Sequence, residues 1–260
     1  MEKLYILFKY FTFINNLLYI TPLLKYNYLI KTPKDVNFMN TFNLQKILNF
    51  FNYIFWFFCL NIFFLIFNIP LVLFFLFIGL DKVVTYLPLF LVCTIPLMPS
   101  ITVLFYCMNK IIKYKDLNLF YDIYMGLKLN IKQSIFLWCC ELFIIFILSI
   151  NVRFFTQYQF SLLFNCMFIT LFLILLLITP YIYLLLSRFS LKSYDLIKNS
   201  LILAVTRPLI TISNILILLF CMILFEISPG TTILFASSIF TFLVSYNSKI
   251  LLNNLEELSN

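Results

Sequence analysis

The sequence contains no histidine, only three glycines and few charged residues. Histidine is the commonest general base and metal ligand in proteins, so its absence removes the usual basis for acid–base catalysis or a metal centre. The glycines, Gly79, Gly126 and Gly230, are too few and too widely spaced for a phosphate-cradling loop or a dinucleotide fingerprint. The seven cysteines form no C-x-x-C pair and lie mostly within apolar runs. The sequence therefore predicts no cofactor, no metal and no catalytic site.

Hydrophobic residues are present in excess. They make up 63% of the 260 residues, and charged residues only 11%, whereas soluble domains are about half apolar and about a quarter charged. A soluble protein of this size has too little interior to bury so many apolar side chains. The net charge of +8 does not indicate nucleic acid, because Lys and Arg flank apolar stretches, where they suit anionic lipid headgroups. The composition predicts an integral membrane protein whose partner is the lipid bilayer.

Six apolar stretches approach the length of about 20 residues that a helix needs to cross a bilayer. They are residues 53–78, 83–108, 134–151, 161–186, 209–225 and 231–251. The second stretch contains three prolines and is expected to bend or unwind near the sequence IPLMPS. The predicted fold class is all-α, a polytopic membrane protein with about six transmembrane helices and cytoplasmic amphipathic helices. The predicted organisation is an interfacial or cytoplasmic segment (1–50), a six-helix domain (51–252) and a polar tail (253–260).

The basic residues orient this arrangement in the membrane. With the N-terminus in the cytoplasm, every Lys and Arg except Lys82 and Arg153 falls in a segment on the cytoplasmic side. Positively charged loops remain cytoplasmic. The sequence thus predicts a multi-pass membrane protein with both termini in the cytoplasm.

The first 24 residues allow two interpretations. Residues 4–24 are apolar enough for a seventh span, but polar side chains recur at steps of three and four and gather on one helical face. That pattern is typical of a helix lying in the membrane interface, which is the interpretation favoured here. Residues 117–131 and 190–201 show the same amphipathic periodicity and are predicted to form helices on the cytoplasmic side.

Five stretches in this order resemble the YesL-like family of bacterial membrane proteins, a domain of unknown function. They are LNIFFLIFNIPLV, IPLMPSITVLFYCMNKII, LKLNIKQSIFLWCCELFIIFILSINVRFF, TPYIYLLLSRFSLKSYDLIKNSLILAVTRPLITISNILILL and LLNNLEELSN, together covering roughly residues 50–257. The resemblance implies an all-helical plasma-membrane protein. It also implies an accessory role in carbohydrate uptake, with a component of a carbohydrate importer as partner. It supplies no catalytic or ligand-binding residues.

Three polar residues within the predicted spans form the candidate intramembrane site. Glu141 is an acidic residue inside an apolar span, where a charge is costly, so it is expected to be neutral, paired or turned towards the protein interior. Asn61 and Asn68 are two helical turns apart and share a face of the first span. Each of the three can either line a polar cavity or join helices through hydrogen bonds.

Three hypotheses for function arise from these features. The first is a non-enzymatic accessory or scaffold protein whose amphipathic helices bind a partner. The second is a small-solute transporter or permease in which Glu141, Asn61 and Asn68 line one polar cavity. The third is a membrane enzyme, which the absence of histidine and of an assembled acid–base pair disfavours.

Overall fold

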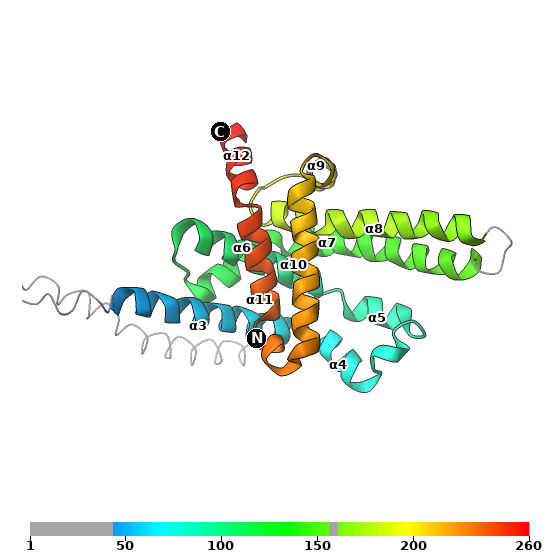
Figure 1. Ribbon diagram of the computed structural model, residues 1–260, viewed down its shortest axis with the longest axis horizontal. Coiled ribbons are helices and arrows are strands. Elements are labelled where there is room, and N and C mark those ends of the chain that lie inside the picture. The colour runs from blue at the N-terminus through cyan, green and yellow to red at the C-terminus, as the bar shows by residue number, and fades with distance from the viewer. Residues whose placement is uncertain (1–43, 156–160, 260) are drawn as a thin grey trace, which may run out of the picture. The chain divides into compact units, whose positions relative to one another are not determined.

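The computed structural model describes residues 44–155 and 161–259, and within these ranges the chain forms helices and no strand (Figure 1). The elements are α3 (Leu44–Phe67), α4 (Ile69–Phe77), η2 (Leu80–Lys82), α5 (Leu87–Cys93), α6 (Leu97–Tyr114), α7 (Leu119–Phe155), α8 (Ser161–Leu186), α9 (Ser193–Thr206), α10 (Pro208–Ile227), α11 (Pro229–Asn247) and α12 (Lys249–Ser259). The predicted interfacial helix at residues 4–24 lies outside the described residues. The chain divides into two units, residues 1–48 and 49–260, and the second contains all the described helices except the start of α3.

The first predicted span is not one helix. Residues 53–78 are divided at Asn68 between α3 and the nine-residue α4. Pro70 stands at the start of α4, where it has no N–H to donate to the carbonyl of Ile66 and its ring crowds the preceding turn. The helix that is long and apolar enough to cross a membrane is Phe50–Phe67, which begins and ends earlier than the predicted span.

The predicted break in the second span is confirmed. Helix α5 ends at Cys93 and α6 begins at Leu97. Pro96 cannot donate to the carbonyl of Val92, and the N–H of Ile95 donates to that carbonyl instead, at 3.2 Å. The apolar segment extends over Leu87–Tyr114, beyond the predicted end at residue 108.

Helix α7 merges two elements that were predicted to be separate. The amphipathic segment 117–131 and the third span 134–151 form one helix of 37 residues, because no proline interrupts residues 119–155. At 1.5 Å per residue such a helix is about 55 Å long, well beyond the hydrocarbon thickness of about 30 Å. One part of α7 must therefore extend past the apolar layer.

The remaining spans agree more closely with the sequence. Helix α8 has the predicted bounds 161–186, and α10 extends the fifth span by one or two residues at each end. The sixth span is divided, because α11 and α12 meet at Ser248 with a bend of 53° between them. The predicted polar tail 253–260 is largely helical as part of α12. Among the described residues, five helices are long and apolar enough to cross a membrane, or six if α11 and α12 count as one broken span. The chain is an all-α polytopic membrane protein.

Helix α6 is central to the packing. It contacts α7, α8 and α11, and its residues enter two hydrophobic clusters. Phe105 faces the cluster formed with α7 and α8, whereas Leu104 and Met108 face the cluster that contains Leu60 of α3. Two hairpins flank α6, α7 with α8 and α10 with α11, and Figure 1 shows that they run in different directions.

Gly126 allows α6 and α7 to approach closely. A Cβ atom at this position would lie 3.1 Å from Cδ1 of Tyr106 and 3.3 Å from Cγ1 of Val103. These separations are shorter than ordinary van der Waals contact, so a larger side chain would push the two helices apart.

We expect Gly126→Leu to destabilise the protein by about 1–3 kcal/mol through overpacking of this contact. Gly230→Leu is the matched control, because a Cβ at Gly230 meets nothing within 4 Å. Thermal unfolding in detergent measures both variants. Equal melting temperatures for the two leucine variants would contradict the proposed close contact.

Candidate functional site

Asn61 joins α3 to α11. Its side chain is 1% exposed, and its amide nitrogen donates to the carbonyl of Ile233 at 2.6 Å. Its carbonyl oxygen accepts from the backbone N–H of Ser237 at 3.2 Å and from the hydroxyl of Ser237. These partners occupy both ends of the amide, so Asn61 acts as a link between helices that are more than 170 residues apart in the sequence.

Asn68 joins the break between α3 and α4 to α6. Its amide nitrogen donates to the hydroxyl of Ser100 at 2.7 Å and to the carbonyl of Phe64 at 2.9 Å. Ser100 in turn donates to the carbonyl of Leu97 at 2.7 Å. The side-chain carbonyl oxygen of Asn68 is buried and has no hydrogen-bond partner among the described residues.

Glu141 joins α7 to α8. It is 7% exposed, and its carboxyl group lies 2.9 Å from the hydroxyl of Tyr183 and 3.0 Å from that of Thr179. Thr179 also lies 2.8 Å from the carbonyl of Leu175 and has one proton for the two contacts. A neutral Glu141 satisfies every group: its O–H donates to Thr179, Thr179 donates to Leu175, and Tyr183 donates to the other carboxyl oxygen. This arrangement suits a carboxyl group inside an apolar layer.

The three predicted residues have separate partners. Asn61 is bonded to α11, Asn68 to α6 and Glu141 to α8. In the described part of the chain, no hydrogen bond connects one of these three side chains to another. Each polar group is used to join a pair of helices, which is the simpler of the two roles that the sequence allowed.

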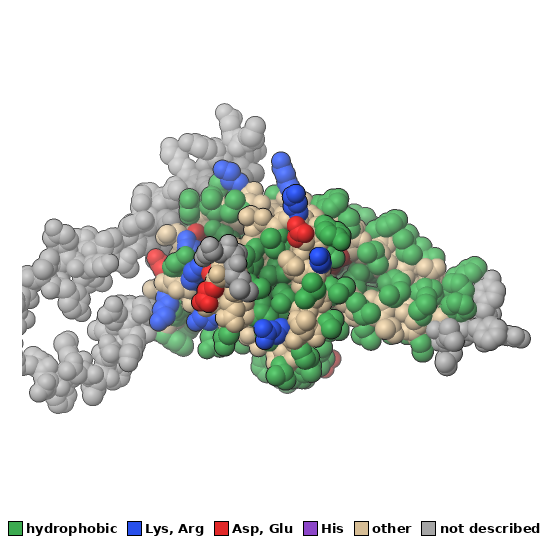
Figure 2. Space-filling model, turned by 90° about the horizontal axis from the view of Figure 1, so that it is seen from above, with side chains coloured by type: hydrophobic (Ala, Val, Ile, Leu, Met, Phe, Trp, Pro, Cys, Tyr) green, Lys and Arg blue, Asp and Glu red, His purple; other side chains and the backbone are tan. Residues whose placement is uncertain are grey.

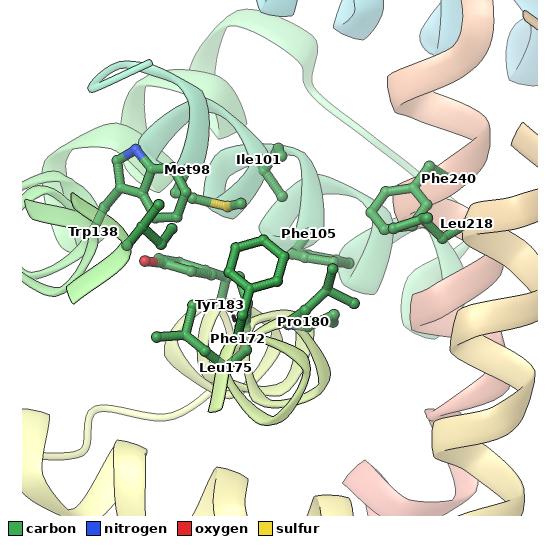
Figure 3. A pocket seen from close by; sticks show the side chains of 13 residues that line it. Met98, Ile101, Phe105, Trp138, Phe172, Leu175, Pro180, Tyr183, Leu218 and Phe240 are labelled. Carbon is green, nitrogen blue, oxygen red and sulfur yellow. Dashed lines mark hydrogen bonds between the residues drawn. The ribbon is translucent and has the colours of Figure 1, made fainter. Parts of the chain in front are cut away.

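An apolar cavity of about 280 Å³ lies where α6, α7 and α8 meet α10 and α11 (Figure 3). Thirteen side chains line it, and none of them is Glu141, Asn61 or Asn68. Figure 3 shows Met98 and Phe105 of α6 near Tyr183 of α8, with Leu218 and Phe240 approaching from the other hairpin. Within the described residues, no three His, Cys, Asp or Glu side chains come close enough to hold a metal ion.

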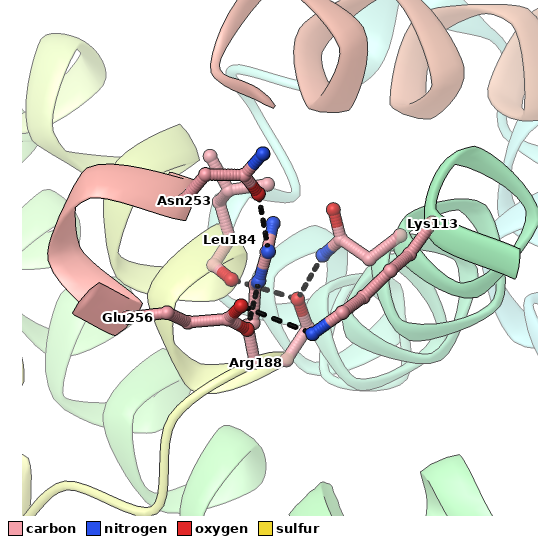
Figure 4. A network of polar contacts seen from close by, with 7 residues as sticks. Lys113, Leu184, Arg188, Asn253 and Glu256 are labelled. Carbon is pink, nitrogen blue, oxygen red and sulfur yellow. Dashed lines mark hydrogen bonds and ion pairs between the residues drawn. The ribbon is translucent and has the colours of Figure 1, made fainter. Parts of the chain in front are cut away.

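A charged cluster at one end of the helices was not predicted from the sequence. Arg188, two residues after the end of α8, donates through Nε to Glu256 at 2.7 Å and through a terminal nitrogen to Asn253 at 2.7 Å (Figure 4). Lys113 of α6 lies 3.0 Å from the other carboxylate oxygen of Glu256. The cluster therefore fastens α12 to α6 and α8. Figure 2, viewed onto the end where α9 and α12 lie, shows Lys, Arg, Asp and Glu side chains gathered among hydrophobic ones.

The sequence alone suggests other roles for these residues. From their positions, Arg188 is expected to be a membrane-interface anchor and Glu256 to lie in a solvated tail, whereas the Arg188 side chain is only 9% exposed. The missed signal was amphipathicity, because residues 249–259 place Leu251, Leu252 and Leu255 on one side of a helix. The hydrogen bond from Arg188, together with Lys113, lowers the pKa of Glu256 to about 2.

A second ion pair was also missed. Asp122, near the start of α7, is fully buried and lies 2.6 Å from Nζ of Lys110 on α6. Its other oxygen accepts the backbone N–H of Asn118 at 2.8 Å, which satisfies a donor at the beginning of the helix. In the amphipathic segment 117–131, Asp122 lies away from the apolar face, but α6 packs against α7 and buries it.

No family model matches the chain, and comparisons with curated proteins and with solved structures also find no match. Any functional conclusion therefore depends on the helices themselves, their apolar lengths and their contacts.

Tyr183→Phe removes the hydroxyl that donates to Glu141 and leaves the carboxyl oxygen without that partner. We expect a loss of about 1 kcal/mol in the free energy of unfolding, as is typical of hydrogen bonds between membrane helices. Denaturation in mixed detergent micelles measures it, and Tyr246→Phe is the control because Tyr246 is 62% exposed. A double-mutant cycle with Glu141→Leu should show coupling. Independent, additive effects of the two changes would contradict the contact.

Glu256→Gln should loosen α12 in a pH-dependent manner. Because its folded-state pKa lies near 2 and its ordinary value is 4.5, the ionised carboxylate stabilises the fold above about pH 4.5 and loses this effect as the pH falls towards 2. We expect the difference in melting temperature between wild type and Glu256→Gln to shrink over that range. Glu257→Gln, a neighbouring exposed position, should show no such difference. A pH-independent difference for Glu256→Gln would contradict the ion pair.

Proposed function

We propose that this protein is a non-enzymatic accessory or scaffold protein of the plasma membrane, and that it binds a membrane-associated partner through α9. The partner suggested by the resemblance to the YesL-like family is a component of a carbohydrate importer. Both termini and α9 would lie in the cytoplasm, as the distribution of Lys and Arg predicts. The observation that carries the proposal is the exposed apolar side of α9.

Helix α9 has two different faces. Leu196 and Ser200 are fully buried, and the helix packs beside α8. The opposite face carries an apolar stripe, which we define as Tyr194, Ile197, Leu201 and Val205. The spacing of three and four residues aligns these side chains along one side of the helix. Tyr194 is 75% and Val205 is 72% exposed, so the stripe is not covered by the described part of the chain.

The start of α9 is held by α7. The side-chain amide nitrogen of Gln133 donates to the carbonyl of Leu191 at 2.9 Å and to the hydroxyl of Ser193 at 3.2 Å. Leu191 and Ser193 precede and begin α9, so the contact fixes where the helix leaves the preceding loop. A helix anchored on one side and apolar on the other can present a fixed surface to a partner. Amphipathic helices of this kind bind by placing their apolar face in a hydrophobic groove of the partner.

The permease hypothesis needs a different arrangement. Glu141, Asn61 and Asn68 would have to converge on one polar cavity, but their hydrogen bonds lead to three different helices. The cavity among the central helices is lined by apolar side chains and by hydroxyl and indole groups with partners elsewhere. A sugar passing through would find no free donor or acceptor among the described side chains on these walls. The scaffold hypothesis therefore has the better support.

The first test is to tag the protein, extract it in native-lipid particles and identify co-purifying proteins by mass spectrometry. We expect near-stoichiometric recovery of an importer permease or its solute-binding protein. Leu201→Glu should abolish this recovery, because it places a charge in the centre of the apolar stripe. Thr206→Glu is the matched control, an added carboxylate on the same helix at an exposed position outside the stripe.

Recovery of the protein alone, or only with copies of itself, would overturn the proposal and favour transport. Unchanged recovery with Leu201→Glu would show that α9 is not the binding surface. If the apolar stripe instead lay among the lipid headgroups, quenchers attached to lipid would quench a fluorophore placed at Tyr194. Adding the partner would then leave this quenching unchanged.

A further inference from the structure

The apolar cavity lies entirely among candidate membrane helices. Its walls come from five of them, including Phe105 of α6, Trp138 of α7, Tyr183 of α8, Leu218 of α10 and Phe240 of α11 (Figure 3). Helix α6 and the α7–α8 hairpin form one side of the cavity, and the α10–α11 hairpin, which runs in a different direction, forms the other. The cavity is thus a gap left where α6 and the α7–α8 hairpin meet the α10–α11 hairpin.

Polar groups in the walls are turned to partners outside the cavity. The indole N–H of Trp138 donates to the carbonyl of Thr94 at 2.8 Å. The hydroxyls of Tyr183 and Thr179 are engaged with Glu141, which is not itself a lining residue. The surface that faces the cavity is consequently almost pure hydrocarbon, which neither water nor a sugar would favour.

The cavity opens towards the outside of α8. Phe172 and Leu176 line it and are 42% and 38% exposed, so they form its rim on the outer surface of the helices. In a bilayer this surface faces lipid. By contrast, Phe105 is 1% and Trp138 is 6% exposed, so these two side chains mark the inner wall.

We propose that this cavity holds the hydrocarbon chain of a membrane lipid. An empty apolar void of about 150 Å³ accommodates benzene, so one of about 280 Å³ has room for a chain segment roughly twice that size. Lipid chains are already apolar, so the gain is not release of water. It is the dispersion contact that the side chains of an empty cavity forgo. The chain enters past Phe172 and Leu176 and ends against Trp138 and Phe105. Occupation of the cavity by lipid does not depend on what α9 binds.

Trp138 offers a direct test, because the chain contains only two tryptophans, Trp56 and Trp138. The full-length Trp56→Phe protein is reconstituted into phosphatidylcholine vesicles whose acyl chains are brominated near the middle. Bromine quenches indole fluorescence only at close range. We expect strong quenching of Trp138 relative to vesicles without bromine, although surface lipid scarcely reaches this side chain.

A substitution that fills the cavity distinguishes quenching by an inserted lipid chain from quenching by lipid outside the protein. Leu218→Phe adds a ring to the cavity wall and should reduce the quenching several-fold, whereas Leu219→Phe, on the exposed side of the same helix, should leave it unchanged. If Leu218→Phe does not fold, Ile101→Phe fills the cavity from α6. No quenching in the Trp56→Phe background would overturn the proposal. Equal quenching in a folded cavity-filled variant and in Leu219→Phe would do so too.

Discussion

Inside a bilayer, a polar side chain has no water and must find its partner within the protein, and this constraint accounts for the hydrogen bonds of Asn61, Asn68 and Glu141. Hydrophobic burial cannot select one helix arrangement over another, because lipid tails are as apolar as leucine. Selection falls instead to a few hydrogen bonds. Asn61 selects α11, Asn68 selects Ser100 and Glu141 selects Tyr183. Close packing at Gly126 adds a steric preference to these polar ones.

The helix break at Pro96 also takes part in the hydrogen bonds that join the helices. Where Pro96 interrupts the second span, the local backbone rearranges and the indole of Trp138 reaches across from α7 to the carbonyl of Thr94. Trp138 therefore stabilises an irregular segment that lipid alone would not tolerate. Its ring then forms part of the wall of the apolar cavity. The break before α6 leaves the carbonyl of Thr94 within reach of Trp138 on α7. Because the indole N–H is directed to that carbonyl, the part of the ring that lines the cavity is apolar.

The sequence predicted the fold class and several element positions, because runs of apolar residues and prolines act locally. The bounds of α8 and the break before α6 are of this kind. It did not predict that α7 continues through residues 131–134. The amphipathic pattern of 117–131 and the apolar run of 134–151 look like two elements in the sequence, yet both lie on one helix. The partners of Asn61 and Glu141, and the cluster of Arg188 with Glu256, depend on which helices become neighbours. No local pattern contains that information, and a lone polar residue in an apolar run indicates only that some partner exists.

The hydrogen bonds between Asn61 and α11 can form only late in the synthesis of the chain. Its acceptor and donor groups lie 172 and 176 residues further along the chain, so α3 enters the membrane long before α11 has been synthesised. Until then the amide of Asn61 needs some temporary partner, such as water, lipid headgroups or another membrane protein. Assembly of these helices must therefore stay reversible through most of synthesis, and it becomes fixed when α11 is made and Asn61 exchanges its temporary partner for Ile233 and Ser237.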